Sequence, residues 1–97
     1  SASAQLDSKA NVLLRWITDT LRPAKKWNNE RVIIFTEYRA TQNWLKTVLA
    51  TEGLTAGDRL LTMYGGMDAK EREAVKAAFQ TDPAISPVRI LLATDAA

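Results

Sequence analysis

Apolar residues recur along the chain in two patterns, one helical and one extended. From Asp7 they return every three or four positions, which predicts an amphipathic helix that ends near Pro23. The same spacing predicts a second helix that carries residues 44–49 and stops at Gly53, and a third helix over residues 68–80. The first apolar stripe consists of Ala10, Leu13, Leu14, Ile17 and Leu21. Asp7 or Ser8 is the expected cap of the first helix.

Three short segments are apolar at consecutive positions, within residues 31–36, 59–64 and 88–93. A strand that is apolar on both faces is typical of a parallel sheet covered by helices on both sides. The elements follow as helix, then strand–helix–strand–helix–strand, which implies two right-handed crossovers. The predicted fold class is therefore α/β, a three-layer open parallel sheet with at least three strands and three helices. The order of the strands in the sheet stays open.

The carboxyl ends of the three predicted strands carry groups that suit an anion. All strands of a parallel sheet end at one edge, and ligands bind in the crevice beyond it. These ends offer Thr36, the pair Gly65 and Gly66, and Thr94. Hydroxyl groups, free backbone N–H groups and a helix N-terminus all donate to phosphate oxygens. The pattern therefore favours a phosphate-binding edge.

Each of these groups also has a purely structural interpretation. The two threonines can bond their own turns, and the paired glycines can serve only a backbone with positive φ. Asp68, with Glu71 three residues later, forms an N-cap pattern that stabilises a helix by about 1 kcal/mol and needs no ligand. Its negative charge makes the glycine N–H groups better anion donors than the helix end. Residue types and spacing alone leave the two interpretations nearly level.

Composition excludes several kinds of chemistry. The 97 residues form one domain or part of one, and they include no His and no Cys. Imidazole bases, thiol nucleophiles, disulfides and the common zinc sites are therefore absent. No P-loop sequence occurs, and the carboxylates form no obvious acid–base pair. We therefore predict no catalytic residue and no metal site in this chain, and the net charge of +2 by itself predicts no nucleic-acid binding.

Three segments together resemble known motifs in the correct order. RVIIFTEYRAT at 31–41 resembles motif IV of helicases, and YGGMDAKEREAVKAAF at 64–79 resembles the glycine-led motif that follows it. VRILLATD at 88–95 resembles the start of motif V. The chain thus resembles the second, C-terminal RecA-like domain of superfamily-two helicases and translocases. The lead-in at 6–10 is similar to that of Swi/Snf-type remodellers and their bacterial relatives.

The resemblance implies a role for individual residues. Gly65, Gly66 and Thr94 would contact backbone phosphates of a nucleic-acid strand. Three further residues would lie near the same strand or brace the domain interface, namely Thr36, Tyr38 and Arg39. Asp95 and Arg72 would belong to the ATP cleft between two domains. Ala69 stands where DEAD-box relatives carry the glutamine of a Q-x-x-R pattern, and this departure favours a remodeller-like subfamily.

The resemblance also implies partners and a cellular context. The parent protein would be an ATP-dependent helicase or translocase, with ATP and Mg²⁺ held mainly by an N-terminal RecA-like domain. That domain and a nucleic acid, DNA in preference to RNA, are the expected partners. We expect a cytoplasmic, bacterial protein with no membrane association. For the chain by itself we expect no bound cofactor and no ATP hydrolysis.

The sequence also indicates where the domain begins, and it leaves one alternative function open. Residues 1–6 are expected to be a tail, disordered or left over from cloning, and residues 7–97 a partial domain that ends before motif VI. The alternative is a non-catalytic interaction module, flavodoxin-like or receiver-like. It fits less well because no G-x-G-x-x-G turn occurs, and because the first two strands end in Thr36 and Gly65 rather than in an acid.

Overall fold

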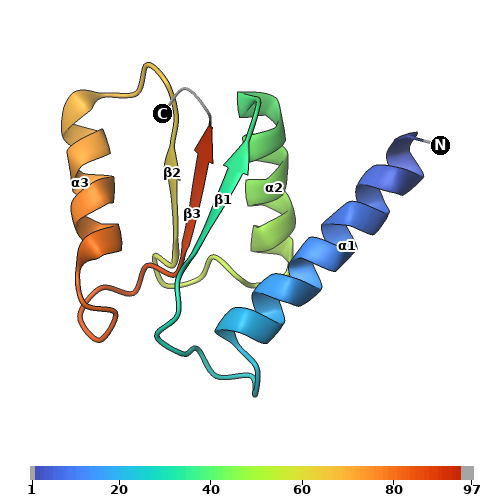
Figure 1. Ribbon diagram of the computed structural model, residues 1–97, viewed down its shortest axis with the longest axis horizontal. Helices are drawn as coiled ribbons and strands as arrows, with labels where there is room; N and C mark the ends of the chain where they lie inside the picture. The colour runs from blue at the N-terminus through green and yellow to red at the C-terminus, as the bar shows by residue number, and fades with distance from the viewer. Residues whose placement is uncertain (1, 95–97) are drawn as a thin grey trace.

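Three helices and three parallel strands make up the part of the chain that the structure describes. The computed structural model describes the backbone of residues 2–94 and the side chains of residues 7–94. The elements in order are α1 (Ala2–Leu21), β1 (Val32–Thr36), α2 (Arg39–Thr51), β2 (Leu60–Met63), α3 (Ala69–Gln80) and β3 (Ile90–Thr94). The sheet stands between α3 on one face and α1 with α2 on the other (Figure 1). The predicted α/β class with a parallel sheet is confirmed.

The strand order, which the sequence left open, is β1-β3-β2. β3 lies in the centre and pairs in parallel with both neighbours, so that Ile90 is the register partner of Val32 on one side and of Leu60 on the other. α2 carries the chain from β1 past β3 to β2, and α3 carries it back to the centre. Right-handed crossovers in opposite directions place their helices on opposite faces of a sheet.

The hydrophobic core lies on the face covered by α1 and α2. Alternate residues of the strands point toward these helices, as Val32 and Ile90 do. The other buried members of this core are Ile17, Leu21, Leu45, Leu49, Leu54 and Leu92. Every residue of β3 is buried, as its apolar run predicted. Burial of this kind contributes about 25 cal/mol per Å² of apolar surface, which makes this face the main source of stability.

The opposite face departs from the prediction that each strand is buried on both sides. α3 packs against β2 and has no buried residue among its twelve. β1 lies at the far edge from β2, so Ile33 and Phe35 remain 45% and 68% exposed. The prediction is therefore confirmed for the central strand and wrong for β1, within residues 2–94.

The predicted helix ends are confirmed except at the start of α1, and α1 ends at Leu21 as expected. Asp68 is the N-cap of α3, and its carboxylate accepts hydrogen bonds from the backbone N–H groups of Lys70 at 3.0 Å and Glu71 at 3.2 Å. Gly53 follows α2 with φ +74°, as expected of a glycine just past a helix. α1 begins at Ala2, earlier than predicted, so Asp7 lies inside the helix and is not its cap.

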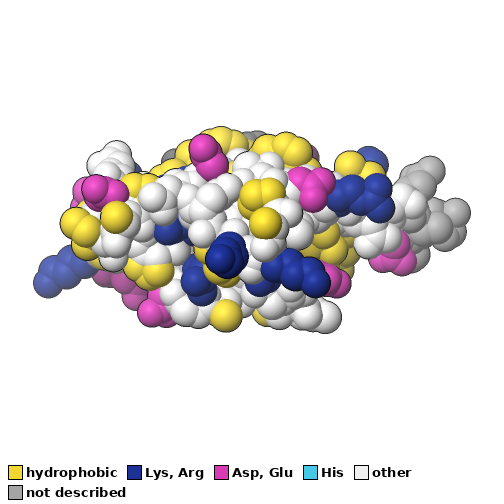
Figure 2. All heavy atoms as spheres, turned by 90° about the horizontal axis from the view of Figure 1, so that it is seen from below, with side chains coloured by type: hydrophobic (Ala, Val, Ile, Leu, Met, Phe, Trp, Pro, Cys, Tyr) yellow, Lys and Arg dark blue, Asp and Glu magenta, His cyan; other side chains and the backbone are white. Residues whose placement is uncertain are grey.

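Arginine side chains bind backbone carbonyl groups at the amino-terminal edge of the sheet. Arg31 donates to the carbonyl oxygens of Phe79 at 2.7 Å and Val88 at 2.9 Å. Figure 2 shows this edge, with Lys and Arg side chains near the centre of the view. Burial lowers the pKa of Arg89, and the positive charges of Arg31 and Arg59 lower it further. These arginines satisfy carbonyl groups, including those at the C-terminus of α3, so their clustering has a structural explanation.

Candidate functional site

Thr36 and Thr94 lie side by side at the carboxyl edge of the sheet. They are direct register partners in the pairing of β1 with β3, and they are 8% and 5% exposed. The Thr36 hydroxyl lies 3.4 Å from the Tyr38 carbonyl oxygen, a long hydrogen bond within its own turn. The structure thus brings together the two predicted hydroxyl groups, and it gives the structural interpretation of Thr36 some support.

Arg39 connects the start of α2 to the end of β2. Its guanidinium carbon lies 3.5 Å from the centroid of the Tyr64 ring, and Tyr64 immediately precedes the glycine pair. A guanidinium stacked on an aromatic ring at this separation gains about 0.5–2 kcal/mol, depending on how far it is desolvated. The stack places a positive charge next to the predicted glycine turn. Tyr64 was absent from the predicted site, because nothing local in the sequence indicates its contact with Arg39.

Gln42 supports the position of Arg39, and it too was absent from the predicted site residues. Its side chain is fully buried, and its amide nitrogen donates to the carbonyl oxygens of Met63 at 3.0 Å and Leu92 at 2.9 Å. Its amide oxygen accepts a hydrogen bond from Arg39. A buried amide needs such partners because an unpaired one costs free energy. The available signal was a polar residue at position 42 in line with Leu45 on the apolar stripe of α2.

Glycine at position 66 is required by the backbone. Gly66 has φ +83°, and a Cβ atom built on it would contact nothing within 4 Å. The constraint is therefore conformational, not steric. Within residues 2–94, no group accepts a hydrogen bond from the N–H of Gly65 or Gly66. The first N–H groups of α3 are partly occupied by Asp68, so the glycine N–H groups stay the better predicted donors.

Arg72 braces the glycine turn from α3. Its guanidinium donates to the Tyr64 carbonyl oxygen at 2.8 Å. The backbone N–H of Tyr64 points to the Met67 sulfur at 3.4 Å, which closes the turn. The observed contact of Arg72 is structural, and its predicted place at an ATP cleft stays a prediction. Asp95, the other residue assigned to that cleft, lies outside the described residues.

The N-terminus of α2 adds donors that the sequence analysis did not identify. Its N-cap residue, Tyr38, makes no side-chain capping bond, and the first turn of the helix contains no acid. The first N–H groups of an uncapped helix lack intrahelical partners and carry partial positive charge. They lie directly after Thr36 at the same edge of the sheet. Tyr38 itself is 63% exposed and stands beside this helix end.

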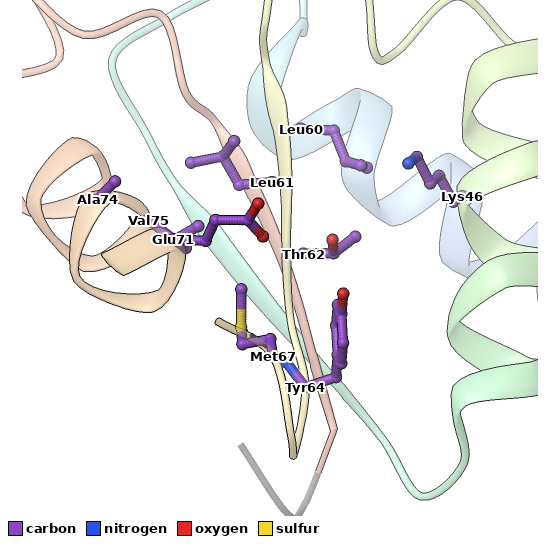
Figure 3. A pocket seen from close by; sticks show the side chains of 9 residues that line it. All are labelled: Lys46, Leu60, Leu61, Thr62, Tyr64, Met67, Glu71, Ala74 and Val75. Carbon is purple, nitrogen blue, oxygen red and sulfur yellow. Dashed lines mark hydrogen bonds between the residues drawn. The ribbon is translucent and has the colours of Figure 1, made fainter. Parts of the chain in front are cut away.

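A hollow of about 360 Å³ runs along β2, beside the strand ends (Figure 3). Tyr64 and Met67 line its end near the glycine turn, and Lys46 from α2 and Glu71 from α3 stand on opposite sides of the strand. Nowhere in residues 2–94 do three or more His, Cys, Asp or Glu side chains gather in a way that could hold a metal ion.

Comparison with known protein families decides the relationship of the chain. The model of the helicase conserved C-terminal domain matches residues 8–97. The chain belongs to this family. No individual curated protein and no solved structure gave a significant match. The open parallel sheet agrees with a RecA-like helicase C-terminal domain, and the flavodoxin-like or receiver-like alternative is not favoured.

Helicase C-terminal domains generally engage nucleic acid and an N-terminal partner domain. This membership supports a part in a helicase-type motor as the general role of the chain. Across residues 2–94, none of the helices is long and apolar enough to span a membrane. The individual site residues stay predictions, because family membership alone does not test them.

Proposed function

We propose that this helicase C-terminal domain contributes backbone-phosphate contacts to the motor of an ATP-dependent helicase or nucleic-acid translocase. The observation that carries the proposal is that two hydroxyl groups, one guanidinium and the glycine turn lie together at one edge of the sheet. Thr36 and Thr94 are register partners, and Arg39 stacks on Tyr64 next to the glycine turn. Hydroxyl, backbone N–H and guanidinium donors are the groups that bind phosphate oxygens in proteins.

Arg39 is the strongest single phosphate ligand in this proposal. Its stack on Tyr64 and its bond to Gln42 hold the guanidinium in one orientation, while the residue as a whole stays exposed. A planar guanidinium offers five donors, so the bond to Gln42 leaves others to bind a phosphate with two parallel hydrogen bonds. Because Gln42 is bonded to β2 and β3, the position of Arg39 is coupled to the sheet.

The remaining donors suit a strand that is tracked without regard to base sequence. The hydroxyl groups of Thr36 and Thr94, the N–H groups of Gly65 and Gly66, and the N-terminus of α2 contact phosphates and read no base edge. Tyr38 lies beside them and is largely exposed, which suits a contact with a sugar or a base. Contacts of this kind serve a motor that must step along any sequence, and we favour DNA over RNA as its substrate.

ATP chemistry belongs to the parent protein in this proposal. ATP and Mg²⁺ are held mainly by an N-terminal RecA-like domain, with Arg72 and Asp95 on this side of the cleft. The bond from Arg72 to the Tyr64 carbonyl supports a link between α3 and the phosphate-binding edge. When bound, ATP supplies the free energy that alternates phosphate contacts between the two domains. In this proposal the chain by itself hydrolyses no ATP.

The subfamily is proposed from residues rather than from the fold. The lead-in at residues 6–10 and the alanine at position 69 favour a bacterial Swi/Snf-type protein of the cytoplasm. The proposal leaves open whether the motor separates strands or only tracks along them. Comparison of single-stranded and double-stranded substrates shows which form of DNA the site binds.

The test is fluorescence anisotropy with labelled single- and double-stranded DNA at several salt concentrations. Affinity is expected to fall with salt, since phosphate contacts release counterions. Thr94→Val removes the hydroxyl and keeps the shape, and it should weaken binding about fivefold. Thr47→Val is the matched control, because Thr47 is exposed and bonds only within α2. Equal affinity of both variants and the unmodified chain would overturn the phosphate assignment.

A further inference from the structure

β2 has a free edge that is ready to bond another strand. Within the described residues it pairs only with β3. The Arg59 carbonyl accepts from the Ile90 N–H at 2.9 Å, so residues 59, 61 and 63 turn their backbone groups toward β3. Leu60 and Thr62 consequently turn their N–H and C=O groups toward the free edge. This strand, Leu-Leu-Thr-Met, contains no proline and no charge, the usual protections of an edge strand.

The same edge forms the floor of the hollow described above. Leu61 points toward α3, where Val75 and Met67 continue the apolar surface, whereas Leu60 and Thr62 point toward α2 (Figure 3). The two helices therefore form walls on both sides of the strand. Backbone donors and acceptors on the floor, with apolar side chains beside them, are what an extended peptide requires.

We propose that this groove binds an extended peptide segment, which adds to β2 as a further strand of the sheet. The backbone of the segment bonds to Leu60 and Thr62. Every second side chain faces α3 and is apolar, since it meets Leu61 and Val75. This peptide site adjoins the phosphate-binding edge at Tyr64, but it uses the backbone of β2 and does not depend on the proposed motor function.

The charges on the two walls specify the chemistry of the segment further. Lys46 reaches from α2 toward Leu60, and Glu71 stands on the α3 side of the strand (Figure 3). Neither is in an ion pair with another described residue. Side chains that face α2 therefore gain from being acidic, and an acid in the α3 position meets the like charge of Glu71. The expected segment alternates acidic and apolar residues.

A separate peptide fits this groove better than a second copy of the chain. Pairing of two β2 edges would bring α2 and α3 of one copy against the same helices of the other, because these helices flank the edge on both faces (Figure 3). Lys46 and Glu71 of one copy would then lie against the helices of the other copy. A single extended segment has no flanking helices and avoids this contact.

The test is NMR titration of the ¹⁵N-labelled chain with a short capped peptide in which aspartate and leucine alternate. The amide signals of residues 60–63 are expected to shift, and the signals of β1 are not. One peptide is N-methylated at the central leucine and another at the central aspartate, because the leucine amide faces β2 in a parallel added strand and the aspartate amide in an antiparallel one. One of the two changes should weaken binding about tenfold, since it removes a paired backbone donor. Lys46→Glu should weaken this peptide about fivefold and favour a lysine–leucine peptide. Lys9→Glu, at an exposed lysine in the half of α1 that extends away from the sheet (Figure 1), should change neither.

Three outcomes would overturn the proposal. The first is that the amide signals of residues 60–63 do not shift with peptide at up to about 2 mM, which would mean that the peptide does not bind even with a millimolar dissociation constant. The second is binding that tolerates N-methylation at both positions, since a surface contact without strand pairing needs neither amide. The third is concentration-dependent shifts of the same amides without peptide, which would assign the edge to a second copy of the chain.

Discussion

The guanidinium of Arg39 lies 3.5 Å from the centroid of the Tyr64 ring, although 24 residues lie between the two in the chain. Arg39 opens α2, and Tyr64 follows the last residue of β2. Because α2 follows β1, and β3 lies between β1 and β2, this contact links the segments that follow the two outer strands at the carboxyl edge of the sheet.

Replacement of Tyr64 should therefore weaken nucleic-acid binding without removing any direct phosphate ligand. Tyr64→Leu removes the ring that orients Arg39, and we expect the dissociation constant for DNA to rise about fivefold, the equivalent of one cation–π contact. Tyr64→Phe retains a ring face and should bind nearly as the unmodified chain does. Anisotropy titration at low salt compares the three proteins. Equal losses in both variants would mean that the hydroxyl matters and the stack does not.

Gln42 should be more important for stability than its polar character suggests. Gln42→Leu leaves the buried carbonyl groups of Met63 and Leu92 without the amide and frees one side of Arg39. We expect the free energy of unfolding to fall by about 2 kcal/mol, measured by urea denaturation. Gln80→Leu at the exposed end of α3 is the matched control and should change it by less than about 0.5 kcal/mol. A neutral Gln42→Leu variant would contradict the role of the amide.

The sequence was informative where burial or local geometry governs the residue pattern. Runs of apolar residues identified all three strands, and Asp68 was correctly predicted as the cap of α3. Because parallel strands end at one edge, the proximity of Thr36 and Thr94 could also be anticipated. The fold class, the helix caps at α2 and α3, and the shared edge thus follow from periodicity and turn chemistry.

Long-range geometry could not be predicted from the same patterns. The position of β3 between its neighbours depends on the directions of two crossovers, which no local spacing encodes. The Arg39–Tyr64 stack follows from that order, because α2 must pass over β3 to reach β2. Phe35 is apolar and yet exposed, since α3 packs over β2 on the same face and leaves β1 uncovered. An apolar pattern indicates which faces are apolar, and it does not indicate how much of each face a helix covers.

Gly66 should resist replacement for conformational reasons alone. Its φ of +83° disfavours any residue with a Cβ atom, although the space around it is open. We expect Gly66→Ala to lower the free energy of unfolding by about 1–2 kcal/mol and Gly66→Asn to lower it by less, because asparagine tolerates positive φ better. Thermal unfolding followed by circular dichroism measures both. The opposite ranking of the two variants would show that bulk, not the backbone, is limiting.

Replacement of Arg89 tests the arginine contacts at the amino-terminal edge of the sheet, and its effect on stability is expected to depend on pH. Its guanidinium donates to the carbonyl oxygens of Asn28 at 2.7 Å, Ser86 at 2.8 Å and Pro83 at 2.9 Å. A lysine ammonium cannot reach these separated acceptors together, so we expect Arg89→Lys to cost about 2–3 kcal/mol at neutral pH. Arg15→Lys, on the exposed side of α1, is the control and should be nearly neutral.

The penalty of Arg89→Lys should shrink as pH rises. Burial lowers the pKa of Arg89 most, and the positive charges of Arg31 and Arg59 lower it further. The same influences would hold the pKa of a lysine at this position below its ordinary value of about 10.4. The folded variant then binds fewer protons than the unfolded one between these two pKa values. Stability therefore rises with pH across that window. Urea denaturation at neutral and alkaline pH, each relative to the unmodified chain, measures the change. A penalty that stays constant or grows with pH would show that position 89 does not disfavour a positive charge.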